Sequence, residues 1–121
     1  MSKKILIAED EAHVAKIIQF KLEKNGYEVI HKSNGKEVLA SIISEKPDLI
    51  LLDVMMPGMN GFDVLKEMQK YPDIKDIPTI MVTALGQEAD TVKGFDLGVE
   101  DYIVKPFRPA ELLSRVNRIL K

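Results

Sequence analysis

The sequence predicts an α/β fold in which a parallel β-sheet is covered by helices on both faces. Five short apolar runs are spaced along the 121 residues, and each is followed by a stretch whose apolar residues recur at helical spacing. Strands that alternate with helices in this way are typical of βαβ units with right-handed crossovers. Turn-forming glycine, asparagine and proline residues separate the segments. We therefore expect a doubly wound sheet of five strands with five helices.

The first strand is expected at residues 5–8, where a continuous apolar run ends abruptly at acidic residues 9–11. A run of this kind is typical of a strand that is buried on both faces. Asn25 and Gly26 then stop a helix before the second strand, which is expected at residues 27–31. Four apolar residues on one face predict the helix between these strands: Val14, Ile17, Ile18 and Leu22.

The third strand, at residues 49–52, has the strongest strand pattern in the chain. Asn34 and Gly35 predict a turn before the second helix, and Pro47 ends that helix. The apolar side of the second helix is formed by four residues: Val38, Leu39, Ile42 and Ile43.

A loop of turn-forming residues, 57–61, leads into the third helix. Pro72 and Pro78 bracket the connector from this helix to the fourth strand, which is expected at residues 79–82. The third helix is predicted from three apolar residues at helical spacing: Phe62, Leu65 and Met68.

The last part of the chain predicts a weaker helix at residues 87–97, which contains Gly94, and a fifth strand at residues 102–104. A final helix is expected to run to the last residue. Its apolar side is formed by five residues: Leu112, Leu113, Val116, Ile119 and Leu120.

Length and composition limit the organisation and the function classes. A chain of 121 residues that is 45% hydrophobic is large enough for one core, so residues 1–121 are expected to form one domain. No apolar run is long enough to cross a bilayer or to serve as a signal peptide, and a cytoplasmic protein is expected. The absence of cysteine excludes thiolate chemistry, and a net charge of −2 gives no general attraction to nucleic acid.

Polar side chains follow four of the predicted strands. The carboxyl ends of parallel strands meet at one edge of a sheet, so these side chains are expected to converge there. Carboxylates about 5 Å apart repel by roughly 3 kcal/mol per pair at an effective dielectric near 20, and Mg²⁺ is the natural compensation because it prefers oxygen ligands. The residues concerned are Glu9, Asp10, Asp53, Thr83 and Lys105.

A lysine and a threonine in an acidic site suit a phosphoryl group better than a metal ion alone. In such a site Asp53 attacks phosphorus as the nucleophile, while the metal and Lys105 neutralise the phosphoryl oxygens. Thr83 donates a hydrogen bond to one of these oxygens. The sequence therefore predicts phosphoryl transfer to Asp53.

Four stretches, IAEDE, LLDVMMPGMNGFD, VTA and DYIVKPF, resemble the receiver domain of bacterial two-component response regulators in order and spacing. The resemblance covers essentially the whole chain. It implies a flavodoxin-like sheet of strand order 2-1-3-4-5. It also implies that the domain accepts a phosphoryl group from a sensor histidine kinase, a phosphotransfer protein or a small phosphodonor, and that it catalyses only its own phosphorylation and dephosphorylation.

The resemblance assigns the metal site residue by residue. Asp53 is the phosphoacceptor, and Asp10, Asp53 and the Met55 backbone carbonyl are the implied Mg²⁺ ligands. Glu9 stands where many family members have aspartate, and its extra methylene favours a contact with the metal through water. Neither His13 nor His31 is expected in the site, and His31 has no expected partner.

The resemblance also implies how phosphorylation changes the conformation and the binding surface of the domain. Thr83 and Lys105 contact the phosphoryl group, the Lys105–Pro106 bond is cis, and the aromatic ring of Tyr102 swings inward as Thr83 moves. The output surface is formed by the fourth helix, fifth strand and fifth helix, which bind a downstream effector or a second phosphorylated copy. Charged residues of both signs are expected there: Asp101, Glu111, Arg115 and Arg118.

In the family, side chains two positions after the phosphoacceptor and after the switch threonine border the path of the hydrolytic water. These positions are Met55 and Leu85 in this chain. Neither side chain can orient a water by hydrogen bonding, so a long-lived phosphorylated form is expected.

Three other functions are alternatives to phosphoryl transfer in a receiver domain. A phosphatase or phosphotransferase of the haloacid-dehalogenase type would carry a second acid where this chain has Met55. A flavin or nucleotide site would need a phosphate-binding loop after the first strand, whereas acidic residues 9–11 would repel phosphate. The third alternative is a pseudo-receiver, an interaction module that is not phosphorylated, and it is the weakest because every key position is present.

Overall fold

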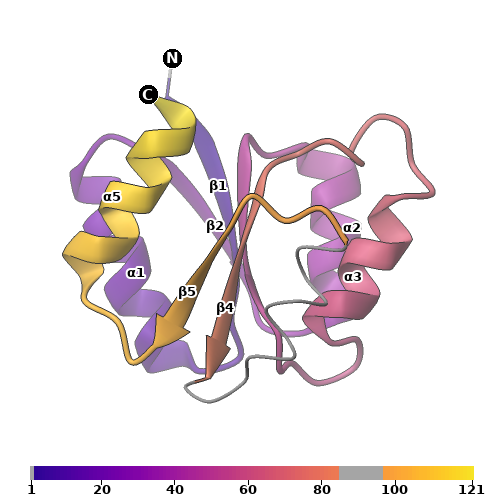
Figure 1. The fold of residues 1–121 in the computed structure, drawn as a ribbon, viewed down its shortest axis with the longest axis horizontal. Coiled ribbons are helices and arrows are strands. Elements are labelled where there is room, and N and C mark those ends of the chain that lie inside the picture. The colour runs from indigo at the N-terminus through magenta and orange to yellow at the C-terminus, as the bar shows by residue number, and fades with distance from the viewer. Residues whose placement is uncertain (1, 85–96) are drawn as a thin grey trace.

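The computed structural model describes residues 2–84 and 97–121, which form a five-stranded parallel sheet with helices on both faces. Figure 1 shows α1 and α5 on one side of the sheet and α2 and α3 on the other. The strands are β1 (Lys4–Ala8), β2 (Glu28–Lys32), β3 (Leu49–Asp53), β4 (Thr79–Ala84) and β5 (Asp101–Lys105). The helices are α1 (Ala12–Lys24), α2 (Gly35–Glu45), α3 (Gly61–Met68) and α5 (Pro109–Leu120).

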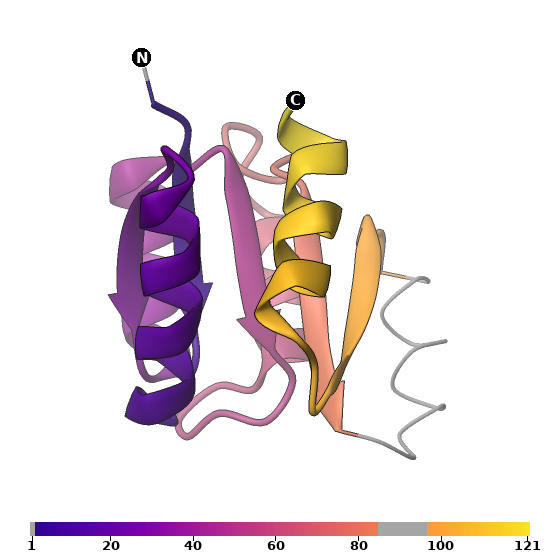
Figure 2. The same ribbon diagram turned by 90° about the vertical axis from the view of Figure 1, so that its left-hand side faces the viewer.

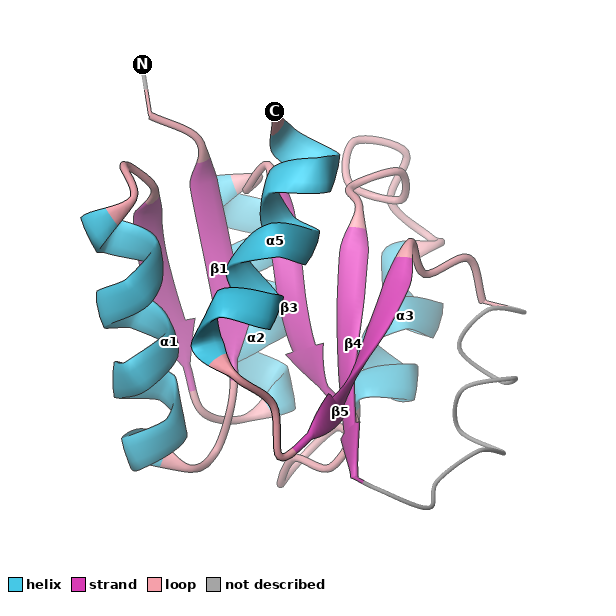
Figure 3. Ribbon diagram, turned by 60° about the vertical axis from the view of Figure 1, so that its left-hand side comes forward, coloured by secondary structure: helices cyan, strands magenta, loops and turns pink. Residues whose placement is uncertain are grey.

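The strand order is β2-β1-β3-β4-β5, as the family resemblance implied. All four pairings are parallel, and every strand therefore ends at the same edge (Figure 3). The register sets Asp53 opposite Val82 and Ala84 opposite Lys105. The carboxyl ends of β4 and β5 are thus level with each other, and β3 ends at the level of Val82 in β4.

The sheet divides the core into two halves. One apolar cluster packs beneath α2 and α3 and includes Ile50, Leu65 and Met81, and the other packs beneath α1 and α5 and includes Ile18 and Leu112. Figure 2 views the second half with α1 and α5 in front of the strands. All five residues of β3 are buried. The strand predicted at residues 49–52 is confirmed, and in the structure it is the middle strand of the sheet.

Two helices differ in detail from the prediction. Ile17 of α1 and Ile43 of α2 were expected on the apolar stripes, but they are exposed at 42% and 38%. Asn34 and Gly35 were expected to form a turn, whereas Asn34 caps α2 by accepting from the Glu37 amide, and Gly35 is the first residue of the helix. The helix predicted at residues 87–97 lies outside the described residues.

The loop after β3 is fixed by its contacts with the helices. Asn60 and Asp63 form a reciprocal capping box at the start of α3. Gly61 begins the helix where a Cβ would lie 2.6 Å from the backbone oxygen of Asp53. Only glycine allows this close approach, which seats α3 directly against the end of β3. No helix in residues 2–84 and 97–121 has the length and apolar content needed to cross a membrane.

Candidate functional site

Three carboxylates gather at the carboxyl edge of the sheet. Oxygen atoms of Glu9, Asp10 and Asp53 all lie within 4.8 Å of one another. Glu9 follows β1 and Asp53 is the last residue of β3, and both side chains are buried, whereas Asp10 is exposed. The convergence predicted from the strand ends is therefore found, with one carboxylate open to solvent.

Lys105, the last residue of β5, joins two of these carboxylates. Its Nζ lies 2.9 Å from Glu9 Oε1 and 2.9 Å from Asp53 Oδ2. A longer contact of 3.5 Å reaches Glu11. The Lys105–Pro106 peptide bond is cis, as the resemblance implied. The ammonium group is the positive centre of the acidic site.

Burial and charge shift the pKa values of this group. Burial raises the pKa of Glu9 to about 7, the hydrogen bond from Lys105 opposes this rise, and the charge of Asp53 adds to it. Burial lowers the pKa of Lys105, but its hydrogen bonds to Asp53 and Glu9 more than reverse this and raise the pKa above its ordinary value. The Lys105 ammonium therefore pairs with two buried carboxylates, those of Glu9 and Asp53. Its single positive charge cannot neutralise both of them when both are ionised.

Thr83 lies near the end of β4, the strand next to the one that carries Asp53. Its side chain is 2% exposed, and its Oγ1 has no hydrogen-bond partner within the described part of the chain. A buried hydroxyl is normally satisfied, so an unpaired one needs a physical explanation. A ligand with acceptor oxygens at this edge would provide the missing bond.

Met55 and Tyr102 occupy different environments around the site. The Met55 backbone amide donates to Asp53 Oδ1 at 3.1 Å, and the Met55 side chain is 72% exposed. Tyr102 is buried in the core beneath α2 and α3, and it pairs with Met81 across the sheet. Met55 thus holds Asp53 through its backbone, and the ring of Tyr102 lies inside the molecule.

Two contacts of the site were missed by sequence reasoning. His31 Nε2 is 2.8 Å from the backbone oxygen of Glu9, so the expectation that His31 has no partner is wrong. Glu11 was not among the expected site residues, yet it contacts Lys105, and its amide donates to Glu9 Oε2 at 3.1 Å. The strand order implied by the resemblance places β2 beside β1, and this was the available signal for the first contact.

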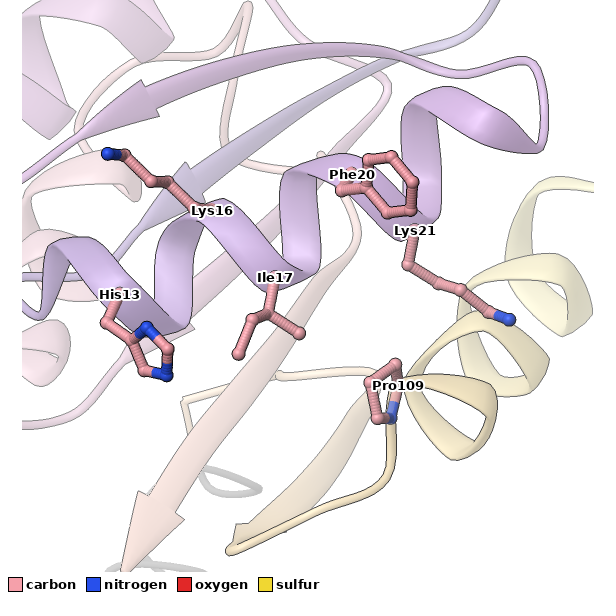
Figure 4. Close-up of a pocket in the computed structure, with 6 residues that line it drawn as sticks. All are labelled: His13, Lys16, Ile17, Phe20, Lys21 and Pro109. Carbon is pink, nitrogen blue, oxygen red and sulfur yellow. The ribbon is translucent and has the colours of Figure 1, made fainter.

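Beside the acidic site, α1 carries an exposed apolar surface. Phe20 is 67% exposed, and Lys24 Nζ lies 5.5 Å from the centre of its ring. Figure 4 shows the shallow hollow between α1 and the start of α5, which is lined by His13, Lys16, Ile17, Phe20, Lys21 and Pro109. An adjoining hollow extends to Lys105 and Pro106. An apolar centre with a basic rim thus begins next to the site.

Comparison with known proteins identifies the family. The sequence model of the response regulator receiver domain family matches residues 5–117 of this chain. The chain belongs to this family. The receiver domain is 44% identical over 121 residues to the alkaline phosphatase synthesis transcriptional regulatory protein PhoP of Bacillus subtilis, and 41% identical to the phosphate regulon transcriptional regulatory protein PhoB of Pseudomonas aeruginosa. It covers 100% of its own length in both matches, but only 50% of PhoP and 53% of PhoB.

Solved structures share the fold of this receiver domain over almost its whole length. The chemotaxis response regulator CheY4 of Vibrio cholerae is 30% identical with a TM-score of 0.92, over 98% of this chain and 99% of that one. The receiver domain of the Francisella response regulator 1452 is 35% identical with a TM-score of 0.90, over 98% and 96% of the two chains. The receiver domain therefore spans whole solved receivers and about half of the curated transcriptional regulators.

Proposed function

We propose that this receiver domain accepts a phosphoryl group on Asp53 and thereby acts as a switch in two-component signal transduction. The observation that carries the proposal is the position of the Asp53 carboxylate, 2.9 Å from Lys105 Nζ and within 4.8 Å of two further carboxylates. An aspartate that only capped a helix or a loop would not need a lysine and two further carboxylates around it. The phosphodonor is a sensor histidine kinase, a phosphotransfer protein or a small acyl phosphate.

The acidic cluster fits a magnesium ion. Asp10 and Asp53 supply carboxylate oxygens and Met55 a backbone carbonyl, which are the hard oxygen ligands that Mg²⁺ takes together with water and phosphate oxygens. The Glu9 carboxylate is already bonded to Lys105 and to the Glu11 amide, which favours a contact with the metal through water. When bound, the ion neutralises charge on the carboxylates and on the phosphoryl oxygens.

The protein groups prepare Asp53 for attack. Each oxygen of the Asp53 carboxylate accepts a hydrogen bond from a different donor: Oδ1 from the Met55 amide and Oδ2 from Lys105. One oxygen forms a bond to phosphorus while the bond from phosphorus to the leaving group breaks, and the leaving group takes the electron pair. Lys105 then neutralises the transferred oxygens, and the Thr83 hydroxyl, unpaired in the described structure, donates to one of them.

Intact-mass spectrometry after incubation with acetyl phosphate tests this function. With Mg²⁺ the protein should gain one phosphoryl group, because two anions approach only when their repulsion is offset. The Asp53→Asn variant should gain none, and EDTA should abolish labelling of the parent. Asp73→Asn is a matched control, because Asp73 is exposed and pairs only with Lys46 among the described residues. Labelling of Asp53→Asn equal to the parent would reject Asp53 as the acceptor.

The rival functions give different results in the same experiment. A pseudo-receiver would stay unlabelled under every condition. A haloacid-dehalogenase-like enzyme would turn over excess phosphodonor, but the position of its second acid holds Met55, whose side chain is 72% exposed. We therefore assign this domain catalysis of its own phosphorylation and dephosphorylation only.

The exposed surface of α1 is our candidate for docking the phosphodonor protein. It is the apolar surface that adjoins Lys105, and its lysines favour a partner that carries acidic residues around an apolar patch. A partner seated there would bring a phosphohistidine to the carboxyl edge of the sheet. Small phosphodonors need no such surface.

The output is assigned to the surface that contains β5 and α5. Arg115 donates to both carboxylate oxygens of Asp101, at 2.9 and 2.8 Å, and Glu111 lies 3.3 Å from Arg115. Arg118 also pairs with Asp101. These charges are paired within one chain, and the same groups can pair across two copies. We propose that Thr83 and Tyr102 couple phosphorylation to this surface, where a downstream effector or a second copy binds.

Phosphorylation is therefore expected to promote dimerisation. Sedimentation velocity should show a concentration-dependent dimer with acetyl phosphate and Mg²⁺, and a monomer without them. Arg115→Ala should weaken the dimer while leaving labelling of Asp53 intact, since Arg115 lies outside the acidic site. Identical sedimentation of the labelled and unlabelled protein would reject the dimer and leave an effector as the partner.

A further inference from the structure

The imidazole of His31 connects β2 to the chain that leaves β1. His31 Nε2 donates to the backbone oxygen of Glu9 at 2.8 Å. A carbonyl oxygen only accepts hydrogen bonds, so Nε2 carries the proton in this contact. The neutral Nε2–H tautomer and the imidazolium can both make the bond. The hydrogen bond therefore depends on where the imidazole lies and does not require a charge on His31.

Glu9 lies just beyond the paired part of β1. The β1–β2 register ends at Ala8 opposite Lys32, and the Glu9 amide still donates to the backbone oxygen of Lys32 at 3.1 Å. His31 binds the carbonyl of the same residue. Both backbone polar groups of Glu9 are thus held by β2, one through the main chain and one through a side chain.

The two hydrogen bonds to the Glu9 backbone also fix the position of the Asp10 backbone nitrogen and Cα. The peptide group that joins the two residues is planar, so the Glu9 carbonyl, the Asp10 nitrogen and the Asp10 Cα move together. The Asp10 side chain is exposed and, in residues 2–84 and 97–121, has no ion pair or side-chain hydrogen bond of its own. Its carboxylate nevertheless lies within 4.8 Å of those of Glu9 and Asp53. The backbone is what holds it there.

We propose that His31 is a positioning residue of the metal site, which orients the peptide between Glu9 and Asp10 and so holds the Asp10 carboxylate in place for Mg²⁺. The inference rests on the proposed function. It adds a residue from β2, a strand that contributes none of the acidic, hydroxyl or lysine groups of the site. Partners behind the ligands of a metal commonly change its affinity by about ten- to a hundredfold.

Two substitutions at His31 separate the hydrogen bond from packing. His31→Phe keeps a ring of similar shape and removes the donor. His31→Gln keeps a donor, because its amide nitrogen is the same number of bonds from Cβ as Nε2. Glu28→Gln is a matched control, since Glu28 is exposed at the opposite end of the same strand, β2. The Mg²⁺ dissociation constant of each variant is measured by isothermal titration calorimetry at pH 8, and the urea unfolding midpoint without Mg²⁺ reports on the fold.

The dissociation constant of His31→Phe should rise about tenfold, at the low end of the range for residues behind metal ligands. His31→Gln should recover most of this loss, and Glu28→Gln should match the parent. Parental affinity in His31→Phe would overturn the inference, as would a His31→Gln variant as weak as His31→Phe. Failure of the parent itself to bind Mg²⁺ would instead overturn the proposed function, and this inference with it.

Discussion

Replacement of Lys105 by methionine should lower the free energy of unfolding of the metal-free protein by about 2–4 kcal/mol at pH 8. Lys105 Nζ lies 2.9 Å from both Glu9 and Asp53, whose side chains are buried. Methionine keeps the length of the side chain and removes its charge, so two buried carboxylates would face each other without a cation. Removing one partner of a buried ion pair destabilises a protein because the remaining charge stays desolvated.

The pH dependence of this loss follows from Glu9. Its pKa in the folded protein is about 7, above the ordinary value of 4.5, so a proton bound to Glu9 stabilises the folded state. That stabilisation is complete below about pH 4.5 and is lost as the pH rises through about 7. The pKa of Lys105 is raised as well, but its contribution is complete below about pH 10.5, so the charge of Lys105 stabilises the parent at both pH 5 and pH 8. The deficit of Lys105→Met should therefore be larger at pH 8 than at pH 5.

Urea unfolding at both pH values, with and without millimolar Mg²⁺, measures this effect. Mg²⁺ should recover part of the loss at pH 8, because it compensates the same carboxylates and binds only the folded state. Lys70→Met is the matched control: Lys70 pairs with Glu67 at 2.7 Å, but its side chain is 68% exposed, and the substitution should leave stability unchanged. Equal stability of Lys105→Met and the parent at pH 8 would show that the buried ion pairs do not hold the fold.

The double substitution Met55→Asn with Leu85→Glu should speed release of phosphate from phosphorylated Asp53 by tenfold or more. Hydrolysis needs a water in line with the bond between phosphorus and the Asp53 oxygen, and an amide and a carboxylate at these positions can orient it. Each tenfold corresponds to about 1.4 kcal/mol of barrier. Met55 is 72% exposed, so asparagine fits there without repacking the core. Leu85 lies outside the described residues.

The lifetime is measured as the decay of the phosphorylated mass after rapid removal of acetyl phosphate. The parent should persist for minutes to hours, and the double variant should decay faster under the same conditions. Met55→Leu is the control, because it changes the shape of the side chain and adds no hydrogen-bonding group. If the double variant releases phosphate no faster than the parent, access of water does not limit the lifetime.

Sequence patterns predicted most of the sheet because buried parallel strands have a strong local signature. The apolar run at residues 49–52 became β3, and the acidic, hydroxyl and lysine residues after the strands did converge at one edge. Strand order was not encoded in any local pattern, and it came from the family resemblance. That order places β2 beside β1, but the bond between His31 and Glu9 also depends on the register of the two strands and on the direction of the His31 side chain, which no local pattern encodes.

Exposure was harder to predict than helix position. Apolar spacing located α1, but it could not tell that Ile17 faces the hollow beside Pro109, or that Phe20 is exposed. Hydrophobic patterning assumes that apolar residues are buried, and it fails where an apolar residue is kept on the surface. The contact between Glu11 and Lys105 was missed for another reason: Glu11 directly precedes α1, and an acidic residue at the start of a helix is common in any protein.

Asp53 stands at the end of the strand that is least able to move. β3 is buried along its whole length, is paired on both sides, and lies between the two halves of the core. Backbone amides in such a strand exchange with solvent only when the whole domain opens. A chemical event at Asp53 therefore meets a rigid support behind it. In the proposed function, any rearrangement after phosphorylation would be taken up by the surrounding loops and outer strands. The strand that carries the phosphoacceptor would then also be the fixed reference against which the rest of the domain moves.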